Sequence, residues 1–174
     1  MNASTGRSRG WVSRRRLLRK VTVGALVLLL VVSSGAAITF GWKLKHRDDL
    51  ARASEAALDA ARTYAVALTS IDAAHTDQDF TAVRGGATGD FARMYDESAQ
   101  KLKPLLVQAK SVSKGRVVGA GVQSASTDRV VVVLFVDAEI TNVTSPTPRV
   151  DRNRITITMD HIDGKWLASA VDLT

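Results

Sequence analysis

Hydrophobic and polar residues follow three different patterns along the 174-residue chain. Residues 21–42 form one apolar run, residues 43–113 repeat apolar positions every three or four residues, and residues 115–174 alternate apolar and polar positions. These patterns are typical of a membrane span, of amphipathic helices and of strands, respectively. We therefore expect an α+β protein, in which an N-terminal transmembrane helix precedes a cone-shaped domain of helices packed on a curved, about four-stranded antiparallel sheet.

Residues 21–42 have no ionisable side chain and end at Trp42. As a helix, this segment is about 33 Å long, which matches the hydrocarbon thickness of a bilayer. Four basic residues occur within the ten residues that follow it, and seven precede it: Arg7, Arg9, Arg14, Arg15, Arg16, Arg19 and Lys20. The larger basic cluster indicates that residues 1–20 are a cytoplasmic tail and that residues 43–174 lie outside the plasma membrane, as the outer domain of a single-pass protein.

A cleaved export signal is the alternative interpretation of this N-terminal segment. Residues 21–32 would be its apolar core, residues 33–37 its small-residue cleavage site, and Arg14-Arg15 the pair of a twin-arginine signal. The apolar run continues to Trp42, which is longer than an export signal requires. An uncleaved membrane anchor is therefore the favoured prediction.

Periodicity predicts a long helix over residues 43–74, short helices within residues 77–113, and a bend or break at Pro104. Thr76 or Asp77 is expected to cap the first short helix, and Thr88 the second, after Gly85 and Gly86 end the first. The long helix carries an apolar stripe, and the second short helix is expected to bury Phe91, Tyr95 and Leu102. The residues of the stripe are Leu50, Ser54, Ala57, Ala61, Tyr64, Leu68 and Ile71.

The period of two predicts four strands, over residues 115–126, 128–142, 150–163 and 164–174. Asp163-Gly164 is a strong signal for a tight hairpin between the last two. The second strand is apolar from Val130 to Val136, which predicts a central position. In the third strand Ile155, Ile157 and Met159 alternate with polar residues, so one face of the sheet should be buried and the other wetter.

Composition excludes several functions. The chain has no cysteine, so disulfides and thiolate metal sites are excluded. Seven of its 24 basic residues lie in the tail, and the other 17 are balanced by 17 acidic residues. The folded part is therefore neutral, and nucleic-acid binding is not expected. The glycine-rich stretch at residues 85–95 resembles a phosphate loop, but Asp90 stands where lysine would be needed. We therefore interpret the stretch as a fold corner and expect no nucleotide.

Candidate chemistry elsewhere is equally weak. The acidic stretch at residues 72–80 fails the EF-hand pattern, because Ala82 and Thr88 occupy the glycine and glutamate positions. His46, His75 and His161 lack neighbours at zinc-ligand spacing. No nucleophile elbow occurs, and Asp137 with Glu139 is interpreted as a polar strand face. We expect no catalytic, cofactor-binding or metal-binding residues, and no enzyme activity.

Several stretches together resemble the Mce-associated (mammalian cell entry-associated) membrane proteins of actinobacteria. They are residues 60–80 and 86–102, the strand "RVDRNRITITM" and the ending "DGKWLASAVDL". The resemblance implies an outer domain with the nuclear-transport-factor-two-like, ketosteroid-isomerase-like cone. It also implies an accessory scaffold subunit of a lipid importer for fatty acids or sterols, with Mce proteins and permease subunits as partners. No catalytic residue follows from it.

Two alternatives remain open beside this cell-envelope scaffold. One is a scaffold of another envelope machine, such as type IV secretion, whose inner-membrane scaffold has the same anchor and cone. The other is a carrier or enzyme that binds a small apolar ligand in the cone, which a cavity filled by Phe135, Met159 or Trp166 would exclude. Dimerisation of the cone through its sheet is compatible with all three.

Overall fold

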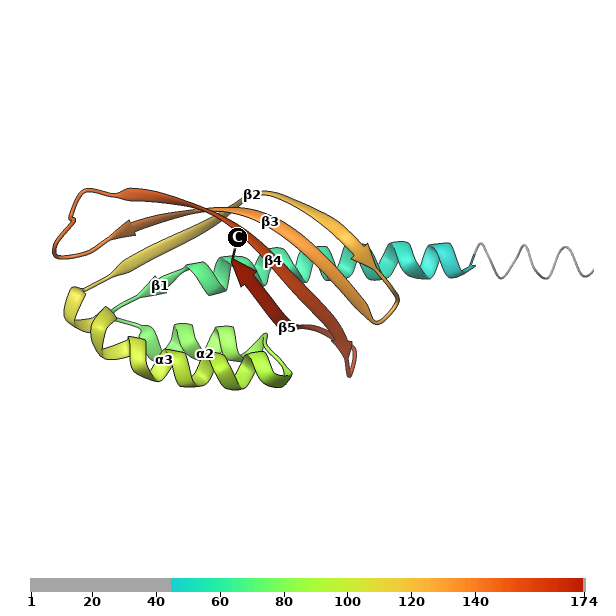
Figure 1. Ribbon diagram of the computed structural model, residues 1–174, viewed down its shortest axis with the longest axis horizontal. Helices are drawn as coiled ribbons and strands as arrows, with labels where there is room; N and C mark the ends of the chain where they lie inside the picture. Colours follow the sequence, from blue (N-terminus) through green and yellow to red (C-terminus); the bar gives the residue numbers. More distant parts are fainter. Residues whose placement is uncertain (1–44, 174) are drawn as a thin grey trace, which may run out of the picture. The chain divides into compact units, whose positions relative to one another are not determined.

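The structure, a computed structural model, describes residues 45–173, and their contacts group Asp48–Thr174 into one compact unit. The first helix is described over residues 45–69, and the elements that follow it are shown in Figure 1. They are β1 (Ile71–Asp72), α2 (Thr76–Gly85), α3 (Gly89–Ala109), β2 (Val112–Ala125), β3 (Arg129–Thr141), β4 (Arg149–Ile162) and β5 (Lys165–Leu173). The predicted membrane span, residues 21–42, lies outside the described residues. Among the helices that are described, none is both long and apolar enough to cross a bilayer.

All five strands form one antiparallel sheet in the order β1-β2-β3-β4-β5. Figure 1 shows this sheet curving over the helices, which lie on its inner side. The α+β fold class predicted from the sequence is therefore confirmed, with the two-residue β1 as an additional strand. The β4–β5 hairpin turns at Asp163 and Gly164, both at positive φ (48° and 77°), as an Asp-Gly hairpin requires.

The first helix ends at residue 69 rather than 74. Its last turn is held by β2, because the Ser113 hydroxyl donates to the Thr69 carbonyl and the Gly115 amide donates to Ser70 Oγ. Ile71, which the sequence placed on the helix stripe, instead pairs with Ser113 in β1. The Ser113 side chain of β2 therefore binds a backbone carbonyl that a longer helix would have used.

The boundaries of α2 and α3 also differ from the predicted ones. His75 precedes α2 at the N-cap position, and Thr76 is already inside that helix and buried. α3 is a single helix that runs through Pro104 and ends at Ala109, and Lys110 follows it in the left-handed conformation. Thr88 stands at the N-cap of α3, but its side chain makes no capping hydrogen bond.

The core lies between the helices and the inner face of the sheet. Ala57, Ala61, Tyr64 and Ala65 of the first helix face this interior, and small residues there allow the helix to approach the sheet closely. The sheet contributes a set of fully buried side chains: Val130, Val132, Leu134, Val136, Ile155, Ile157 and Met159.

One expected core position is wrong. Leu102 is 50% exposed, and Ala99, three residues earlier on α3, is buried instead. Phe135 is 51% exposed, because it points to the outer face of the sheet.

Candidate interaction surfaces

The central strand β3 is apolar on both faces. Even-numbered residues from Val130 to Ala138 face the core, so Val131, Val133 and Phe135 point outward together with Asp137 and Glu139. Asp137 and Glu139 thus share a polar end of the outer face, as expected from their spacing. Phe135, directly before them, is a large apolar side chain in a position open to water.

A hollow of about 460 Å³ surrounds Phe135 on this outer face; it is lined by Val118, Phe135, Val136, Asp137, Arg152, Asn153 and Arg154. The register between β2 and β3 shifts between Val117 and Gly119, which leaves Val118 as an extra, unpaired residue that is 51% exposed. Gly119 pairs with Phe135, and a Cβ atom at Gly119 would lie 3.5 Å from the phenylalanine ring. The absence of a side chain there keeps one side of the hollow open.

Arginines form the opposite wall of this hollow. Arg154 pairs with Phe135 across the β3–β4 ladder, and Arg152 pairs with Asp137. The carboxylate of Asp137 lies 3.8 Å from the guanidinium of Arg116 on β2. Arg152 and Arg154 are exposed, and neither has an ion-pair partner within 4.0 Å among residues 45–173. The hollow therefore combines an exposed aromatic ring with uncompensated positive charge.

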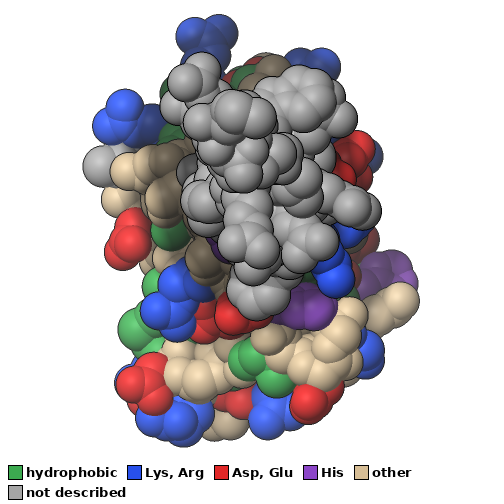
Figure 2. Space-filling model, turned by 90° about the vertical axis from the view of Figure 1, so that its right-hand side faces the viewer, with side chains coloured by type: hydrophobic (Ala, Val, Ile, Leu, Met, Phe, Trp, Pro, Cys, Tyr) green, Lys and Arg blue, Asp and Glu red, His purple; other side chains and the backbone are tan. Residues whose placement is uncertain are grey.

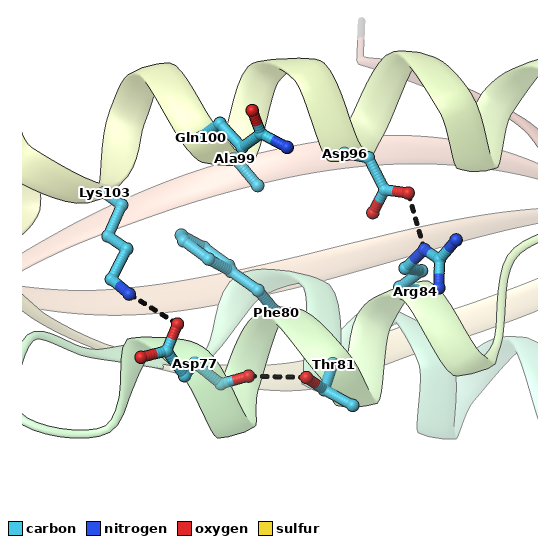
Figure 3. Close-up of a pocket in the computed structure, with 8 residues that line it drawn as sticks. All are labelled: Asp77, Phe80, Thr81, Arg84, Asp96, Ala99, Gln100 and Lys103. Atoms are coloured by element: carbon cyan, nitrogen blue, oxygen red, sulfur yellow. Dashed lines mark hydrogen bonds and ion pairs between the residues drawn. The ribbon is translucent and has the colours of Figure 1, made fainter.

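A second hollow, of about 250 Å³, lies between α2 and α3. Figure 3 shows Phe80 pointing from α2 toward Ala99 of α3, between two ion pairs that join the helices. Arg84 Nε lies 2.5 Å from Asp96 Oδ2, and Lys103 Nζ lies 2.5 Å from Asp77 Oδ1. Both carboxylates in this hollow are therefore paired with a base on the opposite helix. The two ion pairs hold α3 against α2.

A third hollow, of about 500 Å³, is bounded by the first helix, the end of α2 and the β4–β5 hairpin. Its lining includes Tyr64, Met159 and the half-buried Trp166, whose ring centroid lies 4.9 Å from that of His161. The Tyr64 hydroxyl is buried without a hydrogen-bond partner, and burial raises the pKa of this phenol. Burial also raises the pKa of Tyr95 to about 12. Both phenols are therefore neutral structural groups at physiological pH.

Of the three side chains proposed to fill a ligand cavity in the cone, Met159 alone is fully buried in the core. Trp166 packs against the core at the edge of the third hollow, and Phe135 lies on the other face of the sheet. The three hollows lined by these described residues are thus surface features.

Backbone hydrogen bonds join the glycine-rich corner at residues 85–90 to β5. The Ala168 amide donates to the Gly86 carbonyl and the Thr88 amide donates to the Ala168 carbonyl, both at 2.8 Å. A Cβ atom at Gly86 would lie 2.6 Å from the Tyr64 ring, so glycine also permits this close packing. These contacts give the corner an architectural role.

The remaining polar motifs are dispersed. Asp72 Oδ2 lies 3.3 Å from His75 Nδ1, and no group of three or more His, Asp or Glu side chains within residues 45–173 is arranged to hold a metal ion. On the face shown in Figure 2, basic and acidic side chains lie interspersed. A stripe on α3 is the other notable surface: Met94, Leu102 and Leu105 are 57%, 50% and 60% exposed.

The same fold occurs in solved structures of low sequence identity. An IcmL-like type IV secretion system protein from Legionella pneumophila matches 67% of this chain and 88% of its own, with a TM-score of 0.58 and 9% sequence identity. At this identity the likeness concerns the fold alone.

Sequence relatives occur in Mycobacterium tuberculosis. The uncharacterized protein Rv1362c is 34% identical over 148 residues, which are 82% of this chain but 66% of the relative, so this chain spans just under two thirds of that protein. The outer membrane protein Rv1973 is 31% identical over 143 residues, which are 82% of this chain and 88% of the relative. The family model described as uncharacterized protein Rv1363c/MT1408-like matches residues 18–174, and the chain therefore belongs to the Rv1363c/MT1408-like family.

Proposed function

We propose that this protein is a non-catalytic scaffold subunit of a cell-envelope complex. Residues 21–42 anchor it in the plasma membrane, residues 1–20 remain in the cytoplasm, and the α+β domain binds partner subunits outside. The observation that carries the proposal is the set of large apolar side chains left exposed on two separate surfaces, Val118 and Phe135 on the sheet and Met94, Leu102 and Leu105 on α3. Exposed apolar groups that gather in this way mark interaction sites.

The interior of the domain supports a scaffold over a carrier. Leu134, Ile155, Ile157 and Met159 are almost completely buried between the sheet and the helices, where an apolar ligand would have to bind. Phe80 and two ion pairs likewise occupy the gap between α2 and α3. Surfaces rather than an internal site therefore offer the means of binding.

The comparisons support the scaffold part of the proposal more strongly than lipid import. One solved structure with this fold is a type IV secretion system protein, and one relative is named an outer membrane protein. Membership of an Mce-type fatty acid or sterol importer rests on the sequence resemblance alone. The envelope machine is therefore proposed by class, and its identity is left to experiment.

The test is a mild-detergent pull-down of the tagged full-length protein from its native membrane, followed by mass spectrometry. We expect other envelope subunits in amounts comparable to the bait. A matched variant, Met94→Asp/Leu105→Asp, keeps the core intact and replaces two of the three exposed apolar side chains of the α3 stripe, so it reports whether that stripe binds a partner. Mce and permease subunits would identify a lipid importer, and secretion components a secretion machine. Recovery of the bait alone would refute the scaffold role.

Membrane topology can be tested because the chain contains no cysteine. We expect a Gln78→Cys variant, whose substituted side chain is exposed on α2, to react with a membrane-impermeant maleimide in intact cells. A Ser4→Cys variant should react only after the cells are permeabilised. Labelling of Ser4→Cys in intact cells would contradict the proposed orientation, and loss of residue 4 from the mature protein would indicate a cleaved signal.

A further inference from the structure

We infer that the hollow around Phe135 binds an acidic segment of a partner subunit, with an apolar side chain of that segment against Phe135 and its carboxylates facing Arg152 and Arg154. The inference rests on the proposed scaffold function and adds the surface and the chemistry of the partner. It draws on three features of the outer sheet face: an exposed apolar surface, an opening made by the backbone, and unpaired positive charge.

The apolar part of the site is built by the β2–β3 pairing. Because the bulge leaves Val118 unpaired, its side chain is 51% exposed beside Phe135, which is exposed to the same extent. Gly119 and Gly121 lie opposite Phe135 and Val133, so β2 presents no side chains over this part of β3. A partner side chain can therefore reach the phenylalanine ring directly. The hollow, at about 460 Å³, falls within the size range of sites that bind small molecules and side chains.

The charged part of the site lies on β4. Arg152 and Arg154 are two residues apart, so both project on the same face as Phe135. Asp137 is the acidic residue in the hollow, and Arg116 lies beside it at 3.8 Å. Glu139 lies one pair further along the strand, opposite Lys114. Because each of these two acids faces a base on β2, Arg152 and Arg154 give the site a net positive charge.

Arginine pairs readily with carboxylates, because its planar guanidinium can donate two parallel hydrogen bonds to one carboxylate. A second copy of this chain would bring the same two arginines to the interface, where like charges repel. An acidic peptide with an apolar residue satisfies the ring and the arginines at once.

The test replaces Phe135 with the photoreactive analogue p-benzoylphenylalanine in the full-length protein in its native membrane, and identifies the crosslinked peptide by mass spectrometry. We expect a peptide from a different protein, with net negative charge and an apolar residue close to the crosslink. The Arg152→Glu/Arg154→Glu variant should lower the crosslink yield about tenfold, since two exposed charge contacts become repulsive. Arg152→Lys/Arg154→Lys should retain most of it, because the charge is kept.

The matched control is Lys101→Glu/Lys110→Glu, which makes the same change of net charge on α3 and at the residue that directly follows it. This helix lies on the inner side of the sheet, away from the outer face. The control variant should leave the yield unchanged. A crosslink to lipid, to a second copy or to a basic segment would overturn the inference, as would a yield that the arginine reversals do not alter or no crosslink at all. If the wild-type pull-down still recovers a complex in these cases, the scaffold proposal survives and only the assigned surface fails.

Discussion

Leu134 and Phe135 are adjacent on β3 and similar in hydrophobicity, and the structure predicts very different consequences for their truncation. Leu134 is completely buried between the sheet and the helices, whereas Phe135 is 51% exposed on the other face. Leu134→Ala and Phe135→Ala therefore form a matched pair that tests which face of β3 is inside. The compact unit of residues 48–174 has its own core and is the unit to measure.

The expected magnitudes follow from burial. Leu134→Ala removes buried methyl groups and leaves a cavity in a close-packed core, which costs about 3 kcal/mol of unfolding free energy. Phe135 already has half of its surface in water, so its truncation should cost about 1 kcal/mol. With a typical urea dependence for a small domain, the first change lowers the unfolding midpoint by roughly 2 M and the second by less than 1 M.

Urea unfolding can be followed by the fluorescence of Trp166, which is the sole tryptophan in residues 48–174 and packs beside His161. Leu134→Met serves as the control, since a volume-conserving change in a core usually costs under about 1.5 kcal/mol. Equal losses for Leu134→Ala and Phe135→Ala, or a larger loss for Phe135→Ala, would refute the argument. Such a result would mean that β3 is shifted by one residue, which turns every side chain to the opposite face.

Three further predictions concern the hairpin, a buried phenol and an ion pair. Gly164→Ala should lower the unfolding free energy by about 1 kcal/mol in the same urea assay, because φ is 77° at this position. Gly121→Ala should be close to neutral, because a Cβ atom at Gly121 has no other atom within 4 Å. Tyr64→Phe should leave stability unchanged or raise it by up to about 1 kcal/mol, since it removes a buried hydroxyl that has no hydrogen-bond partner. The hydrogen bonds from Arg129 lower the pKa of Asp160, so their stabilisation is present above the unfolded pKa near 4 and is lost as the pH falls through the folded value. In the Arg129→Gln variant the urea midpoint should therefore fall less steeply as the pH is lowered below about 4. A pH dependence equal to that of the wild type would contradict the pairing.

The last two strands could be predicted closely from the sequence because their signals are local. Asp163-Gly164 fixes the hairpin, and Ile155, Ile157 and Met159 alternate with polar residues, so the inner face of β4 is evident without any tertiary contact. The architectural role of the glycine-rich corner was equally predictable, since Asp90 stands where a phosphate loop would need lysine.

Helix ends were less predictable, because tertiary contacts decide them. Nothing in the periodicity from Leu68 to Ile71 marks a stop, and the first helix ends where Ser113 and Gly115 of β2 bind its last carbonyl and the following serine. A proline interrupts the hydrogen bonds of a helix without fixing where the helix ends, and α3 continues through the exposed Pro104 to Ala109.

The Phe135 hollow could not have been predicted from the sequence. Residues from Val130 to Val136 are all apolar, so β3 carries no alternation to show which side chains face out. The bulge at Val118 depends on how β2 pairs, and Arg152 and Arg154 read in isolation as ordinary solvated charges. Their convergence with Phe135 comes entirely from the β2–β3–β4 register.

Neighbouring strands of the same sheet provide an internal comparison for the outer face. An antiparallel sheet with one face on the core usually carries polar residues on the other, and β4 follows this rule with Thr156 and Thr158 facing out. β3, directly beside it, places Val131, Val133 and Phe135 on that same face. Threonine would fit a strand there as well as valine does, so neither strand propensity nor the core requires the apolar residues. The difference between two adjacent strands is the one expected if the proposed partner segment covers the outer face at β3.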